Sequence, residues 1–330
     1  MSIVPYTPTP FTTPVANPAV GGSGTPYPYI SVSEYMFAPT AVDTQNLNPQ
    51  GSGEDQIQSL SDVIRRASST ADQYLFGADP SAKGASLCAT LSVETGLFPI
   101  LKGELRLICD YKPIVQVNGI DIGPSMGNLT SIGNTLAGQL RIGRRIIHVP
   151  VMNYAVRAGD TGNPNWNSGY GGNYVAVWSY VNGYPHTLLN ASVVAGTSTI
   201  SVLPTDGGTG LLGIINTQTQ MTIVDGSYTE RFTVQSVSGT TITSTTPFQF
   251  NHTLPSSPDT IPVTTLPGAV NQAVIFLTTA LIKTEGNAAL VLDGMNSPKE
   301  VEAAIGGWGH DVEMACKLLH PYKIHVKAKN

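Results

Sequence analysis

Histidine and cysteine side chains are the ones with which this chain could bind a metal ion or activate a nucleophile, so their spacing is the first thing to test. The three cysteines, Cys88, Cys109 and Cys316, lie among apolar neighbours and show no CxxC spacing, which predicts buried free thiols. The histidines form no HExxH pair or other paired spacing; they are His148, His186, His252, His310, His320 and His325. The sequence therefore favours a protein without a metal site or cofactor.

Carboxylates leave one catalytic option open. Asp110, Asp121 and Asp160 could converge in the folded chain as an acid/base pair, but nothing in the sequence singles them out. Residues 208–213, GTGLLG, match the GxGxxG pattern of nucleotide-binding loops. The residues after them predict a strand rather than a helix whose N-terminus could bind a phosphate, so we interpret the segment as an ordinary loop.

A group of aromatic residues could form a sugar-binding platform of a carbohydrate-active enzyme: Trp166, Tyr170, Tyr174 and Trp178. However, Tyr174 and Trp178 alternate with valines along a predicted strand, and packing on either face explains them equally well. A structural or assembly protein is the more economical hypothesis.

Composition limits the class of protein. The chain has 330 residues, enough for two domains, with 12% charged residues, 34 glycines and 24 prolines, which is typical of many short strands and turns. The net charge of −5 argues against a protein that grips nucleic-acid phosphates over its surface. The first residues have neither a basic region nor an apolar run, and no stretch reaches membrane length, so we expect synthesis in the cytoplasm and no membrane insertion.

Four segments have helical patterns. The most apolar is 266–286, where hydrophobic residues recur at helical spacing and leave only a narrow polar stripe, which predicts a buried helix. Residues 54–76 predict an amphipathic helix with acidic residues at its start. Residues 31–35 predict a short helix or turn, and 311–319 predict a closing helix. Residues 289–310 have the composition of a surface loop.

Strand patterns occupy most of the remaining chain. They cover 86–122, with a turn expected at Asn118-Gly119, and then 138–151 and 174–181. Residues 191–260 contain short β-rich runs between Gly, Asp and Ser turns, which predicts a small self-contained all-β module inserted into a core that resumes afterwards.

The two ends of the chain differ in chemistry. Residues 1–29 are rich in proline, almost free of charge and interleaved with Tyr6, Phe11, Tyr27 and Tyr29. They predict an extended arm that is either disordered or ordered by a neighbouring subunit. Residues 317–330 are a basic tail that is either solvated or docked on an acidic partner; its candidate docking residues are Lys317, His320, Tyr322, Lys323, His325, Lys327 and Lys329.

The order of these parts carries a resemblance to a known family. Its most telling stretches are WSYVNGYPHT at 178–187 and LPGAVNQAVIFLTTALIKTEGNAALVL at 266–292, together with LRLICDYKPIVQVNGIDIG at 105–123 and VEMACKLLHPYK at 312–323. The chain resembles the head-to-tail connector or adaptor proteins of long-tailed bacteriophages, particularly those from phages of actinobacteria that carry an inserted β domain. The resemblance extends roughly over 29–322, and the proline-rich arm is not part of the minimal family pattern.

The resemblance implies an α+β fold with a helical connector core, a β-strand elaboration and an inserted, barrel-like all-β domain. Composition places an extended arm at 1–29 and the insert at 191–260; the resemblance assigns 30–190 and 261–316 to the adaptor core and 317–330 to a tail that docks on the portal. It also implies a structural virion protein without enzymatic activity or cofactor, located in the neck at the head–tail interface.

The implied partners are other copies of this chain in a twelvefold ring, the portal protein and a downstream neck or tail-terminator protein, with DNA passing through the lumen without sequence-specific binding. The alternative within the same class is another virion structural protein, such as a tail terminator, tail tube or minor capsid protein.

Overall fold

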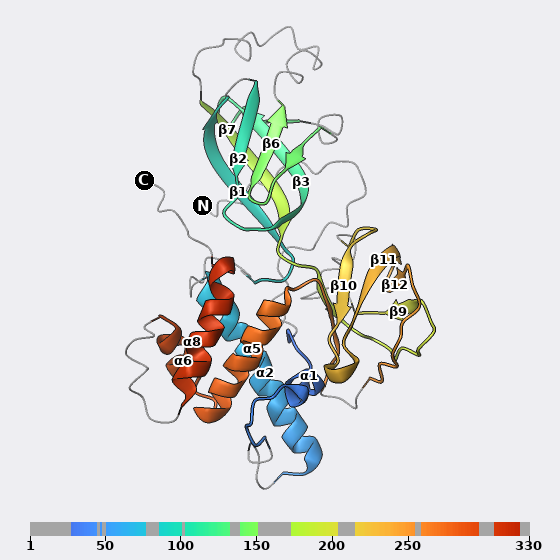
Figure 1. Cartoon of the computed structure of the whole chain (residues 1–330). Helices are drawn as coiled ribbons and strands as arrows, with labels where there is room; N and C mark the ends of the chain where they lie inside the picture. The colour runs from blue at the N-terminus through green and yellow to red at the C-terminus, as the bar shows by residue number, and fades with distance from the viewer. Residues whose placement is uncertain are drawn as a thin grey trace. The chain divides into compact units, whose positions relative to one another are not determined.

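The structure is a computed structural model that describes residues 28–44, 47, 51–76, 86–100, 103–132, 139–150, 173–203, 215–254, 259–296 and 307–323. Helices and several antiparallel sheets are both present, so the predicted α+β class is confirmed (Figure 1). The described chain divides into two compact units. We call residues 89–183 the β unit, and residues 28–88 together with 184–323 the mixed unit.

Helix α5 (Gly268–Lys283) is the centre of the helical part of the mixed unit. Helices α2 (Gly53–Phe76), α6 (Ala288–Asn296) and α8 (Trp308–Leu319) all contact it, and Figure 1 shows α2, α5 and α8 side by side. Val270, Ala273 and Leu277 of α5 are fully buried in one hydrophobic cluster with residues of these helices. The predicted buried helix at 266–286 is therefore confirmed, because its hydrophobic face is wide enough to be covered from several sides.

Local signals set the starts of the first two helices. Ser31 caps α1 (Val32–Phe37), and its hydroxyl accepts a hydrogen bond from the Glu34 amide at 3.0 Å. Before α2, the Ser52 hydroxyl and the Asp55 carboxylate accept from each other's backbone amides at 3.3 and 2.7 Å, which forms a capping box. The predicted helices at 31–35, 54–76 and 311–319 are confirmed.

Residues 289–296 were wrongly predicted to be loop, since they form most of α6. Val291 and Met295 are one helical turn apart and both are buried in the helical core. Packing against that core stabilises a segment whose composition alone does not favour a helix. Residues 297–306 lie outside the described part of the chain.

A six-stranded antiparallel sheet completes the mixed unit, in the order β8-β13-β10-β11-β12-β9. Its strands are β8 (His186–Leu188), β9 (Thr199–Ser201), β10 (Gln220–Ile223), β11 (Glu230–Ser238), β12 (Thr241–Ser244) and β13 (Pro262–Thr264), with the short helix η5 (Gly226–Tyr228) between β10 and β11. A bridge between Leu189 and Val202 joins the extensions of the two edge strands and curls the sheet towards a barrel. The sheet has its own hydrophobic core, and it extends beyond the predicted 191–260 at both ends.

The β unit contains two sheets. One has the order β1-β7-β3-β4, with β1 (Thr90–Pro99), β7 (Asn173–Asn182), β3 (Ile114–Gly123) and β4 (Thr130–Ser131); the other has the order β2-β6-β5, with β2 (Glu104–Ile108), β6 (Ile146–Pro150) and β5 (Arg141–Ile142). Side chains from both sheets share one core, including Leu107, Ile120, Ile147 and Trp178.

Within the range 30–190 that the prediction gives to the adaptor core, residues 89–183 form a compact unit of their own, because their inward-facing side chains contact one another across the two sheets. The turn predicted at Asn118-Gly119 is wrong: β3 continues through both residues, and its pairing with β7 shifts register between Val117 and Gly119. The strand absorbs these residues as a bulge instead of reversing.

Among the described helices, none is long and apolar enough to cross a membrane.

Candidate functional site

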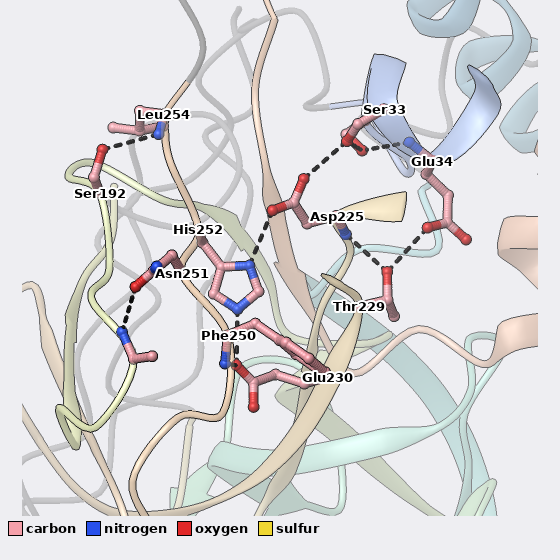
Figure 2. Close-up of polar contacts among 12 residues, drawn as sticks. Ser33, Glu34, Ser192, Asp225, Thr229, Glu230, Phe250, Asn251, His252 and Leu254 are labelled. Carbon is pink, nitrogen blue, oxygen red and sulfur yellow. Dashed lines mark hydrogen bonds and ion pairs between the residues drawn. The ribbon is translucent and has the colours of Figure 1, made fainter. Parts of the chain in front are cut away.

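A buried polar cluster in the mixed unit is centred on His252, whose side chain is fully enclosed (Figure 2). The Nδ1 atom of His252 lies 3.0 Å from Oδ2 of Asp225, and its Nε2 atom lies 2.8 Å from Oε1 of Glu230. Each ring nitrogen therefore faces a carboxylate. We call His252, Asp225 and Glu230 the histidine clamp.

The sheet positions all three members of the clamp. Asp225 follows β10 and precedes η5, and Glu230 begins β11, so both lie at the same turn between paired strands. His252 lies in the loop after β12, and it is held by two backbone hydrogen bonds with Val193, of 2.8 and 2.9 Å. Glu230 also accepts from the backbone amide of Gln249 at 2.9 Å.

The geometry favours the doubly protonated form of His252. A neutral imidazole has one N–H, so its other nitrogen would present a lone pair to a carboxylate; an imidazolium donates from both nitrogens. Burial by itself lowers the pKa of His252, but hydrogen bonds and Coulomb attraction from Asp225 and Glu230 outweigh burial and raise the pKa above its usual 6.5. The clamp is a buried ion triad with one cation and two anions.

The clamp is also the link between the sheet and α1. The Ser33 hydroxyl donates to Oδ1 of Asp225 at 2.9 Å, and the Thr229 hydroxyl donates to Glu34 at 3.0 Å. Nearby, the Val32 amide donates to Asp259 at 3.0 Å. Burial raises the pKa values of the Glu34 and Asp259 carboxyls, because both are partly withdrawn from water. These contacts fix the first turn of α1 against η5.

The order of groups in the cluster does not suit catalysis. In a serine hydrolase, the histidine contacts the serine and removes its proton, whereas here Asp225 stands between Ser33 and His252, and the other nitrogen of His252 is occupied by Glu230. Within the described ranges, no group of histidine, cysteine and carboxylate side chains has an arrangement that could hold a metal ion. The arrangement acts as an electrostatic tie between chain segments.

The described part of the predicted N-terminal arm is an anchor. The prediction gave Tyr29 a contact with another subunit or with a tail-side protein, but Tyr29 is fully buried in its own chain, and its hydroxyl donates to Asp72 of α2 at 2.6 Å. The carbonyl of Pro28 lies 3.1 Å from Nε2 of His186. Tyr29 is therefore a core residue and does not offer a surface to another protein. Burial of its large aromatic ring stabilises the fold more than exposure would. Tyr6, Phe11 and Tyr27 lie outside the described residues.

The predicted C-terminal tail also begins with contacts to its own chain. Lys317 pairs with Glu313 one turn earlier at 2.6 Å, and Tyr322 in η6 (His320–Tyr322) packs edge-on against Tyr184. The Lys323 ammonium lies 4.1 Å from the centre of the Tyr74 ring on α2, a cation–π contact.

Of the tail residues predicted to dock, Lys317 and His320 are exposed, and Tyr322 and Lys323 are half-buried against their own unit. His325, Lys327 and Lys329 lie outside the described residues.

The remaining candidates are dispersed. Asp121 is buried within β3, Asp110 is half-buried just after β2, and Asp160 lies outside the described chain. Trp178 is buried in the core of the β unit, with its ring 5.5 Å from that of Phe98, so it offers no surface for a sugar. Trp166, Tyr170 and the 208–213 loop also lie outside the described residues.

Sequence reasoning missed the histidine clamp. Asp225 and Glu230 stand in a DGSYTE turn between two strands, and His252 is a lone histidine in a loop. The one usable signal is that charged residues are scarce in 191–260, so each is a candidate for a specific pairing.

Comparisons of this chain with protein-family models, with curated proteins and with solved structures gave no match.

Proposed function

We propose that this chain is a structural virion protein that forms the head-to-tail adaptor ring below the portal of a long-tailed bacteriophage, joining capsid to tail and surrounding the DNA channel. The resemblance of 178–187 and 266–292 to that family supports the proposal. The structural observation that carries it is the anchoring of the C-terminal segment to the helical core.

The anchoring makes the basic end of the chain a suitable docking element. Tyr322 and Lys323 are held by Tyr184 and Tyr74, so the chain leaves the helical core at a defined point beside α2. Residues 324–330 then carry His325, Lys327 and Lys329 and no acidic residue. Seven residues can reach at most about 25 Å from that point. A short basic segment with a fixed origin is suited to an acidic surface on a directly adjacent partner, which we assign to the portal.

The charge of the chain supports a role around DNA without binding it. With a net charge of −5, the ring would have few lysine or arginine contacts to phosphate, and each such contact would slow passage of the duplex. The buried cation of the histidine clamp, His252, faces Asp225 and Glu230 and so does not contribute a basic surface.

The test is the mass of the purified chain in solution, alone and after mixing with the portal protein from the same genome. We expect a portal-dependent complex that contains many copies of the chain. Because Leu319 is buried and Tyr322 packs on Tyr184, the tail should be shortened after Lys323 and not earlier. Loss of 324–330 should abolish the complex and leave thermal unfolding unchanged.

A matched control is Arg231→Ala, which removes a positive charge from an exposed position of β11, outside the predicted docking tail, and leaves 324–330 intact; it should still form the complex. Polymerisation into tubes without portal would instead identify a tail protein. A chain that stays monomeric with portal would overturn the adaptor assignment.

A further inference from the structure

We propose that α1 and the two loops beside it form a docking surface for residues 1–25 of a second copy of this chain. The proposal rests on the adaptor function proposed above, since it names the contact by which neighbouring copies in the ring would be joined. The surface consists of four exposed side chains, Met36, Phe37, Tyr228 and Phe250, which we call the aromatic patch.

The patch brings together three segments that are distant in sequence. Met36 and Phe37 end α1 and are 59% and 67% exposed, while Tyr228 of η5 and Phe250 of the clamp loop are 53% and 36% exposed. The rings of Tyr228 and Phe250 lie 5.9 Å apart. A Cβ placed on Gly226 would lie 3.5 Å from Cβ of Phe37, so η5 lies directly beside that residue. Large apolar side chains exposed on touching segments indicate a binding surface.

The histidine clamp connects the segments that carry the aromatic patch. Figure 2 shows Phe250 beside Glu230 and His252, and Ser33 and Glu34 of α1 reaching Asp225 and Thr229. Because these hydrogen bonds already hold the backbone next to the patch, binding a ligand would cost little additional ordering of the loops. A preformed aromatic surface of this kind is suited to an extended, proline-rich segment.

Residues 1–27 have the chemistry of that ligand. They contain six prolines, Tyr6, Phe11 and Tyr27, a PxxP spacing at Pro5 and Pro8, and no charged side chain. An uncharged segment loses little hydration on docking to aromatic rings, and the fixed φ of proline lowers the entropy cost of ordering it.

The place where the segment joins the fold favours a second copy as the acceptor. It enters the core at Pro28 and the buried Tyr29, only a few residues before α1. Thr25 and Tyr27 each precede a proline, which favours extended backbone and disfavours an immediate reversal onto the same α1. In polyproline geometry, 27 residues could span roughly 80 Å, at about 3.1 Å per residue, which is ample to reach a neighbouring copy.

The test uses two full-length variants, Thr7→Cys and Met36→Cys, purified with tags of different mass, mixed, and treated with a short bis-maleimide. The native cysteines in this assay, Cys88, Cys109 and Cys316, are all buried. We expect a cross-linked pair that contains one chain of each tag. Placing the acceptor cysteine at Leu290 instead, an exposed position on α6 that is 42% accessible, should give no such product.

Specificity is tested by adding Phe37→Ser and Tyr228→Ser to the Met36→Cys chain, which should lower the cross-linking yield at least about fivefold. Leu290→Ser in the same background should leave the yield unchanged. Circular dichroism should show both variants folded, because all three positions are exposed. If the Phe37→Ser/Tyr228→Ser chain and the Leu290→Ser chain gave equal cross-linking yields, the aromatic patch would not be the docking surface. A third variant carries both Thr7→Cys and Met36→Cys in one chain. Cross-links that form within this double variant, with none between the two single-cysteine chains, would overturn the second copy as acceptor.

The reactions are run without portal and again on the portal-bound complex, whose mass is measured separately. A portal complex without the cross-link overturns this inference and leaves the adaptor function standing. A cross-link without a portal complex overturns the adaptor function and supports the docking surface. Absence of both overturns both.

Discussion

The two units of this chain each withdraw a carboxylate from water, but they stabilise it differently. In the mixed unit, Asp225 and Glu230 face the positive charge of His252. In the β unit, Glu94 of β1 accepts from the Tyr180 hydroxyl and from the backbone amide of Asp110 at 2.9 Å, which are neutral donors. The first site depends on the second ring proton of His252, whose pKa is raised above 6.5, and the other depends on the hydroxyl proton of Tyr180, whose pKa is raised above 10.0.

The comparison shows that similar side chains can give different sensitivities to pH. The pKa of Tyr180 is raised above its usual 10.0, first by burial and then by the charge of Glu94. Burial, with a contribution from Glu94, likewise raises the pKa of the neighbouring Cys109 thiol to about 12. The β unit therefore favours the neutral forms of Tyr180 and Cys109, whereas the mixed unit favours the charged form of His252.

The largest effect is expected for His252→Leu. It leaves two buried carboxylates without a cation, and breaking a buried ion pair in this way costs about 3–5 kcal/mol of unfolding free energy. Hydrogen exchange measured by mass spectrometry over 220–252 reports this loss of stability in the segments that contain the clamp. The matched control is His310→Ala, an exposed histidine of α8, which should change stability by less than about 0.5 kcal/mol. A cost for His252→Leu as small as that of the control would show that the clamp is not an ion triad.

Tyr180→Phe should have a smaller effect, about 1–3 kcal/mol, because it removes one neutral hydroxyl that donates to Glu94 and accepts from the Tyr111 amide at 3.1 Å. Exchange in β3 and β7 is the readout. Combining it with Glu94→Gln tests the pairing: if the two residues act through one hydrogen bond, the double variant should be less destabilised than the sum of the singles. Additive losses would contradict the pairing.

The pH dependence should separate the two units. The pKa of His252 is raised in the fold, so its contribution is fully present below its unfolded pKa of 6.5 and is lost as pH rises through the higher folded value. Exchange over 220–252 should therefore become faster, beyond the intrinsic rate, as pH rises above 6.5. This dependence should vanish in His252→Leu.

Over the same interval the β unit should not weaken. Its neutral Cys109 and Tyr180 have usual pKa values of 9.0 and 10.0, and the stability they contribute is lost only as pH rises above those values, where the unfolded chain ionises. If both units lost protection from hydrogen exchange in parallel between pH 6.5 and 8.5, the assignment of the pH dependence to His252 would be contradicted.

The smallest effect is expected at Glu104, which shows the same kind of pairing at the surface. Glu104 contacts His148 at 3.1 Å, Arg106 at 3.0 Å and also Arg141, and these partners lower its pKa from 4.5 to about 2. Its stabilising contribution is present above pH 4.5 and is lost as pH falls towards 2. Glu104→Gln should change thermal unfolding little, and the change should shrink further in high salt. A loss comparable to that of His252→Leu would show that burial is not what separates these sites.

Elements with strong local patterns can be predicted from the order of the residues alone. Residues 266–286 and 54–76 are helical because apolar residues recur at helical spacing over many turns, and Ser31 marks the start of α1 through its capping hydroxyl. Strand patterns likewise indicated the regions 86–122, 138–151 and 174–181, in which β1 to β3 and β5 to β7 lie, whereas β8 and β13 were not predicted. These features depend on interactions between residues close in sequence, so they can be read without knowledge of the fold.

The grouping of the elements and the burial of charges depend on contacts that form in the folded chain. The tertiary structure made α6 helical through the burial of Val291 and Met295, and it separated 89–183 from the helical core. It also brought Ser33 to Asp225, 192 positions away along the chain. The pairing of His252 depends on which loops of a curled sheet meet. The energy of such contacts comes from distance and desolvation in the folded state, and the spacing of residues along the chain specifies neither.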